Sequence, residues 1–104
     1  MFNAFNTPDG DFNTLRKSAD IAMLMTNGGD ACGIAYLDVV TSGQTLGVVA
    51  KSCATGYYSF GHEIAHMYGC HHNRETGASN PTFPAAFGFL MRPPVNSGFR
   101  TILA

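Results

Sequence analysis

The sequence predicts an α+β fold in which a mixed β-sheet packs against one helix that carries two histidines. Short apolar runs at 19–26, 32–40 and 46–51 have about the length of buried strands. His62 and His66 are four residues apart, which places both side chains on one face of a helix, one turn apart. The segment after His72 is rich in turn-forming residues. We therefore expect strands first, a helix over about 58–69, and irregular structure below it.

Composition narrows the possible functions. The 104 residues suffice for one small domain with a modest core. The net charge of −1 and the absence of a basic run argue against nucleic acid as a partner. No apolar run approaches membrane-spanning length, so we expect no membrane segment in this chain, and the first ten residues do not read as a signal peptide.

The elements before the helix differ in how clearly they can be assigned. Asp11 or Asn13 could cap a short helical piece that ends near Lys17. The run at 19–26 fits a strand or a helix, and its Ala, Leu and Met content slightly favours a helix. The runs at 32–40 and 46–51, rich in β-branched residues, are predicted to be strands.

Residues 62–72 carry the pattern H-E-x-x-H-x-x-G-x-x-H, which indicates a metal site. Two imidazoles on one helix face can bind the same ion, and imidazole suits Zn²⁺. Gly69 permits a left-handed end to the helix, and the resulting turn would return His72 as a third ligand. Glu63 can reach a water on the same ion without being a ligand. Three protein ligands with one open position are typical of catalytic zinc.

Several neighbours of this motif need an interpretation. Spacing favours His72 over His71 as the ligand, which leaves His71 as a solvent-facing side chain. Ser59 is predicted to cap the helix. Its face away from the ligands is expected to be buried and apolar, with these side chains: Phe60, Ile64 and Met67.

The extended motif resembles that of the metzincin zinc endopeptidases, in particular the reprolysin- and adamalysin-like members. The segment 99–104 is similar to their R-T-I-M-A stretch, in which the methionine lies beneath the three histidines. Leu103 stands at that position here, a change of similar volume. Asn73 stands where these families usually have aspartate. The resemblance covers roughly 19–104 and is most specific at 62–72 and 99–104.

This resemblance implies a zincin-like fold with a strand at 19–26, and 1–104 as part of a metallopeptidase catalytic domain. It implies a zinc-dependent endopeptidase in which Glu63 is the general base for a zinc-activated water and His62, His66 and His72 bind Zn²⁺. The polypeptide substrate would pair with the strand that contains Gly33, Ile34 and Ala35. The chain begins late and ends early relative to this family, so we expect little activity from it in isolation. Its substrate specificity and oligomeric state stay open.

A secreted protease matures in an oxidising environment, which favours a disulfide between Cys32 and Cys53 over two buried thiols. Cys70 would then be free or paired outside this chain. The alternative function is a non-catalytic zinc-bearing structural or interaction module of a secreted assembly, and Glu63 argues for the enzyme because such a module does not need that carboxylate. An accidental motif in an unrelated domain is the third interpretation.

Overall fold

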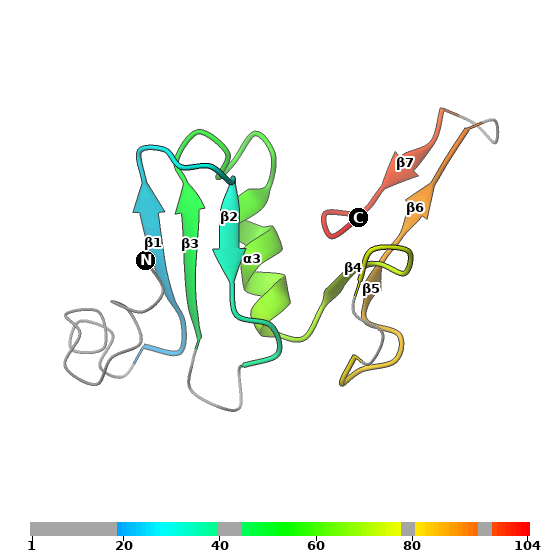
Figure 1. Cartoon of the computed structure of the whole chain (residues 1–104), viewed down its shortest axis with the longest axis horizontal. Coiled ribbons are helices and arrows are strands. Elements are labelled where there is room, and N and C mark those ends of the chain that lie inside the picture. Colours follow the sequence, from blue (N-terminus) through cyan, green and yellow to red (C-terminus); the bar gives the residue numbers. More distant parts are fainter. Residues whose placement is uncertain (1–18, 40–44, 78–80, 94–96) are drawn as a thin grey trace.

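A three-stranded mixed sheet forms one side of the protein. The computed structural model describes residues 19–39, 45–77, 81–93 and 97–104. The sheet contains β1 (Ala22–Thr26), β2 (Gly33–Ala35) and β3 (Leu46–Ala50) in the order β1-β3-β2, with β3 parallel to β1 and antiparallel to β2 (Figure 1). The run at 19–26 is therefore a strand, and the helical piece predicted to end near Lys17 lies outside the described residues.

The central strand β3 is buried along its whole length, because it has a strand on each side and the helix over one face. Leu46 and Val49 are fully buried, and Leu46 and Val48 form a core cluster. Partly buried side chains from β1 and from the end of β2 pack against that cluster: Ala22, Leu24 and Tyr36. A continuously apolar strand is what this central position requires.

The second strand is shorter than the predicted 32–40. Pairing ends at Ala35, and the chain then turns to Asp38, which has a positive φ of 53°. The backbone amides of Asp38 and Val39 donate to the carbonyls of His66 (2.8 Å) and Met67 (2.9 Å). The amides of Asp38 and Val39 thus bind carbonyls at the end of the helix instead of a neighbouring strand. This explains why the chain leaves the sheet early although its sequence favours a strand.

Helix α3 (Ser59–Met67) packs against β2 and β3. Met67 is fully buried, as predicted, and lies over Gly47, where a Cβ would be 2.7 Å from its Cε. Ile64 is partly buried, but Phe60 is 37% exposed, so the prediction that Phe60 is buried is wrong. Gly47 is therefore a position at which the sheet leaves room for a side chain of the helix.

The predicted Ser59 cap is also wrong. The residue before the helix is Tyr58, which has a positive φ of 56° and makes no side-chain capping hydrogen bond. The amides of Ser59 and Phe60 instead donate to the carbonyls of Cys53 and Ala54, each at 3.3 Å. Backbone carbonyls of the preceding turn thus accept the first two amides of the helix, which have no acceptor within the helix.

Beyond the helix the chain forms two short ladders rather than the irregular structure predicted. Strand β4 (His71–Asn73) pairs in parallel with β5 (Phe87–Gly88), and β6 (Leu90–Met91) pairs antiparallel with β7 (Phe99–Arg100). These ladders extend away from the sheet on the far side of α3 (Figure 1). Among the described residues, no helix has the length and apolar character to cross a membrane.

The predicted disulfide is confirmed: Cys32 and Cys53 are bonded, with Cα atoms 5.4 Å apart. Cys70 is a partly buried free thiol. The disulfide joins the residue before β2 to the turn whose carbonyls accept the first amides of α3. It therefore fastens the edge strand to the start of the helix.

Replacement of Cys32 and Cys53 together by serine should lower the free energy of unfolding by about 2–4 kcal/mol, because the bond closes a loop of 21 residues. Urea unfolding of the full-length protein measures this change. Cys70→Ser is the matched control, and it should shift the midpoint little. Equal midpoints for the double variant and the control would contradict a stabilising role for the bond.

Candidate metal centre

Three histidine rings converge at the C-terminal side of α3. The Nε2 atom of His66 lies 2.9 Å from that of His62 and 3.2 Å from that of His72, and the third pair is 3.2 Å apart. Tetrahedral ligands at about 2.0–2.1 Å from zinc are about 3.3–3.4 Å apart. The three nitrogens therefore fit an ion of this size with small adjustments. Among the described residues, these three form the group of histidines, cysteines and acids able to hold a metal.

The turn at Gly69 brings the third histidine to the other two. Gly69 has a φ of 90°, its amide donates to His66 at 2.9 Å, and the amide of Cys70 donates to Ala65 at 3.0 Å. This pair of hydrogen bonds is the Schellman arrangement, which ends a helix and reverses the chain. The expected glycine turn is thus present, and it leads directly into β4, which contains His72.

Backbone carbonyls form hydrogen bonds with the Nδ1 atoms of the two histidines on the helix. His66 Nδ1 lies 2.6 Å from the Cys70 carbonyl oxygen, and His62 Nδ1 lies 2.7 Å from that of Ile102. A carbonyl oxygen only accepts, so each Nδ1 carries the proton and donates. Each Nε2 then keeps a free lone pair directed at the common point, which is the tautomer that a metal needs.

Burial also favours the neutral form of His66 and His72. It lowers the pKa of His66, and the neighbouring rings of His62, His72 and His71 lower it further, while the hydrogen bond to Cys70 acts in the opposite direction. The pKa of His72 is lowered by burial and then by His62 and His71. Neutral imidazole is the form that binds metal, so the site favours metal over protons at neutral pH.

Glu63 lies beside the histidines and is only 5% exposed. Burial raises the pKa of its carboxyl group, and His62 partly offsets that rise. A Cβ at Gly33 would lie 2.5 Å from Glu63 Oε1, so the carboxylate occupies space that only glycine leaves free on β2. The family resemblance placed Gly33 on the strand that would pair with substrate, and the structure gives it this additional role.

A cavity of about 480 Å³ opens in front of the cluster. Its lining contains Glu63, two of the histidines, and residues from both halves of the chain: Cys32, Gly33, Tyr57, Ser59, Asn73, Thr76, Arg100, Ile102, Leu103 and Ala104. Leu103 thus lies at the cavity, near the position expected for the residue that replaces methionine. The cavity brings a buried acid together with two of the histidines, which suits hydrolytic chemistry.

The predicted substrate strand β2 forms one edge of the sheet, and no described strand pairs with its outer side. Gly33 lines the cavity with Glu63, and Ala35 lines a neighbouring hollow with His66 and His72. Ile34 points to the other face and is 53% exposed. Alternation along the strand therefore places the two small residues on the side of the histidines.

Comparison with known proteins agrees with this geometry. The sequence model of metallopeptidase family M12, of the reprolysin type, matches residues 1–102. The chain belongs to this family. The resemblance seen in the histidine motif is thereby confirmed, and the family implies a metal at the site.

Curated relatives carry the name peptidyl-Asp metalloendopeptidase. The protein from Stenotrophomonas maltophilia K279a is 34% identical over 103 residues, which cover 94% of this chain and 25% of the relative. The Xanthomonas campestris protein is 35% identical over 103 residues, covering 94% and 24%. The Pseudomonas fragi protein is 44% identical over 55 residues, covering 53% and 36%. The chain thus spans about a quarter of the length of the first two. No solved structure matches it significantly.

His71 of this M12 chain is not the solvent-facing residue that we predicted. It is 4% exposed, its ring lies 5.6 Å from that of Phe87, and its amide donates to Ala86 at 2.7 Å. Strand β4 alternates, with His71 and Asn73 buried and His72 exposed toward the cluster. Residues 71–73 are all polar, so the sequence showed no two-residue pattern that could have revealed this.

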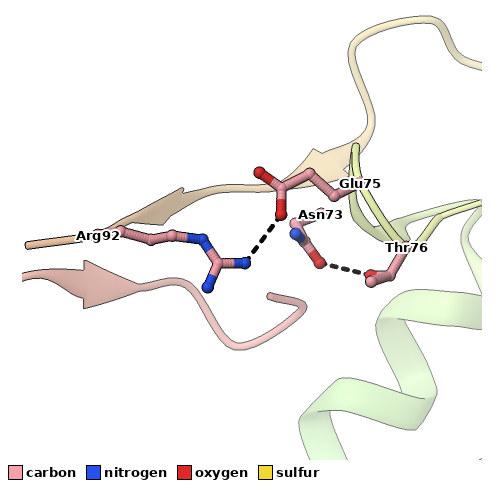
Figure 2. Close-up of polar contacts among 4 residues, drawn as sticks. All are labelled: Asn73, Glu75, Thr76 and Arg92. Atoms are coloured by element: carbon pink, nitrogen blue, oxygen red, sulfur yellow. Dashed lines mark hydrogen bonds and ion pairs between the residues drawn. The ribbon is translucent and has the colours of Figure 1, made fainter.

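Asn73 holds the loop after β4, as Figure 2 shows. Its side-chain oxygen accepts the Thr76 hydroxyl at 2.5 Å, and its carbonyl accepts the amides of Thr76 and Gly77. Arg92 and Glu75 form an ion pair at 2.8 Å nearby, which is too exposed to contribute much stability. Asparagine at this position therefore has a structural role in the turn, which the sequence comparison did not reveal.

Zinc affinity should depend on pH in a way set by the histidines. Because the pKa values of His66 and His72 are lowered, protons compete with zinc for these two rings mainly below the ordinary value of 6.5. Affinity should stay level as pH falls toward 6.5 and weaken below it. Competition with a chromophoric chelator, in full-length apo-protein, measures this. Weakening that begins well above pH 7 would contradict the neutral cluster.

The same titration separates the neighbouring histidines. His72→Gln should weaken zinc binding by more than about a hundredfold, because a ligand is lost. His71→Gln is the matched control and should change affinity only a few-fold, since that ring packs on Phe87. The reverse order would show that His71 is the ligand.

Proposed function

We propose that this chain is the metal-binding part of a zinc metalloendopeptidase that hydrolyses peptide bonds. The observation that carries the proposal is the convergence of three Nε2 atoms beside a buried carboxyl group. In this proposal His62, His66 and His72 hold Zn²⁺, and Glu63 is the general base. The family membership supports the same reaction class.

The residues divide the chemistry between them. Zinc, when bound, supplies Lewis acidity toward water and the scissile carbonyl. Glu63 takes a proton from the attacking water and later gives it to the leaving amine nitrogen. Its raised pKa suits both steps, because a more basic carboxylate accepts a proton more readily and neutral pH then favours its return. No group in the described ranges forms a hydrogen bond to this carboxylate that would block it.

Substrate alignment is proposed to use the free edge of β2. An extended peptide would pair with the backbone of Gly33, Ile34 and Ala35 as an added strand. Because Gly33 and Ala35 lie beside the histidine cluster, such a peptide would run past the site of proton transfer. The scissile bond would then be placed by main-chain hydrogen bonds, independently of most side chains.

The substrate class and location follow from the relatives and the disulfide. We propose cleavage of peptidyl-aspartate bonds, since the relatives are named for that activity. We also propose that the protein is secreted, because the Cys32–Cys53 bond persists best in an oxidising compartment.

Glu63→Gln should lower kcat by a factor on the order of 10²–10⁴ while zinc remains bound, because the amide cannot accept the proton. Peptide hydrolysis by the zinc-loaded full-length protein, with zinc content measured on the same sample, tests this. A chelator should silence the wild type. Glu75→Gln is the control, since Glu75 is an exposed acid at an ion pair.

Two outcomes would overturn parts of this proposal. If Glu63→Gln cleaves as fast as the wild type, Glu63 is not the base. If the zinc-loaded wild type cleaves no peptide in a broad library, the enzyme proposal fails and the structural zinc module becomes the better account.

Gly33→Ala should lower activity on the order of a hundredfold without loss of zinc, because the new Cβ would displace the Glu63 carboxylate. Gly28→Ala is the matched control, since nothing lies within 4 Å of a Cβ there. The measurement compares kcat for both variants with the wild type. Equal rates for all three would show that the contact does not position Glu63.

A further inference from the structure

We propose that Arg100 is the residue that recognises an acidic side chain of the substrate next to the scissile bond. This inference rests on the proposed peptidase function and names the group behind its specificity. The argument starts from the position of one arginine in the cavity that contains Glu63 and two of the histidines.

Arg100 ends β7 and lines the cavity in front of the histidine cluster. Among the described residues of that lining, it is the side chain with a permanent positive charge. Within the described residues, no ion pair or hydrogen bond joins Arg100 to Glu63. The cavity therefore keeps a base and a cation that act on different parts of a substrate.

The other positively charged side chains in the described part of the chain have partners of their own or lie outside this cavity. Arg92 pairs with Glu75 at 2.8 Å. Arg74 lies 4.5 Å from the centre of the Phe87 ring and donates to the Pro84 carbonyl. Lys51 is exposed in the turn after β3 and does not line this cavity. Within the described ranges, Arg100 has no carboxylate side chain as a partner.

The hydrogen bonds of Arg100 suit a carboxylate ligand. Guanidinium has five N–H donors, and Nη1 of Arg100 donates to the Ala104 carbonyl at 2.8 Å. That bond restrains the side chain and leaves donors that can form a two-pronged pair with a carboxylate. A neutral side chain of the substrate leaves these donors without a matching pair of acceptors. The preference for an acidic residue is therefore a difference in binding at Arg100.

A peptide offers a carboxylate from two sources, a side chain or its C-terminus. The test therefore uses peptides with both ends blocked that differ only in Asp or Asn beside the cleaved bond. A third peptide ends in Asn, so that its free C-terminal carboxylate lies beside the cleaved bond. Faster cleavage of the blocked Asp peptide identifies the side chain, and faster cleavage of the third identifies the terminus and overturns the proposal.

The protein variants are Arg100→Gln and Arg100→Lys in the zinc-loaded full-length protein. We expect Arg100→Gln to lower kcat/KM for the Asp peptide about tenfold to a hundredfold and to leave the Asn peptide within a few-fold. For Arg100→Lys, kcat/KM for the Asp peptide should lie between the values for the wild type and Arg100→Gln, because the charge is kept and the paired geometry is lost. Lys51→Gln is the control with the same change of charge, and it should alter neither rate.

An unchanged Asp-to-Asn ratio in both Arg100 variants, with wild-type zinc content, overturns the proposal. Binding of the same blocked peptides to wild type and Arg100→Gln, by calorimetry, separates this failure from failure of the proposed function. If nothing is cleaved but the Asp peptide binds more tightly through Arg100, the recognition stands and the peptidase proposal fails. If binding also shows no such preference, both fail.

Discussion

The three histidines of the candidate metal centre are brought together by the reversal of the chain at Gly69. A side chain there would be strained at a φ of 90°, and a Cβ would lie 3.0 Å from Phe83 and 3.1 Å from Asp38 Oδ1. The reversal does two things at once. It returns the strand with His72 to the helix, and it places the Cys70 carbonyl where it holds His66 in its metal-binding tautomer. One backbone conformation thus brings in the third histidine and sets the tautomer of His66.

The helix itself depends on its surroundings. Nine residues are too few for a stable isolated helix, so packing must hold it. Met67 over Gly47 supplies that packing at one end, and the carbonyls of Cys53 and Ala54 receive the first amides at the other. The same packing presses Glu63 against Gly33, so two glycines on neighbouring strands control where the helix and its carboxylate sit.

Short-range patterns made the helix, the histidine pair and the Gly69 turn predictable, because spacing and backbone freedom alone determine them. The disulfide needed the inferred secreted context as well. Long-range contacts were not predictable. Strand β2 ends early because helix carbonyls accept the amides of Asp38 and Val39. Phe60 is exposed because its neighbours do not cover its side chain. The prediction of a Ser59 cap was wrong because the helix begins one residue earlier than that cap requires, with Tyr58 before it. The prediction for His71 was wrong because a strand of three polar residues shows no alternation of polar and apolar side chains in the sequence.

The hydrogen bond between His62 and the Ile102 carbonyl has a consequence for biosynthesis. The two residues are 40 positions apart, so the ribosome releases all three histidines well before the group that orients the first of them. Contacts of such sequence separation form after local ones. The nascent chain can therefore complete its helix and turn while the ring of His62 is still free to rotate. The orientation of His62 is then fixed late in folding, after the segment that contributes that carbonyl has docked.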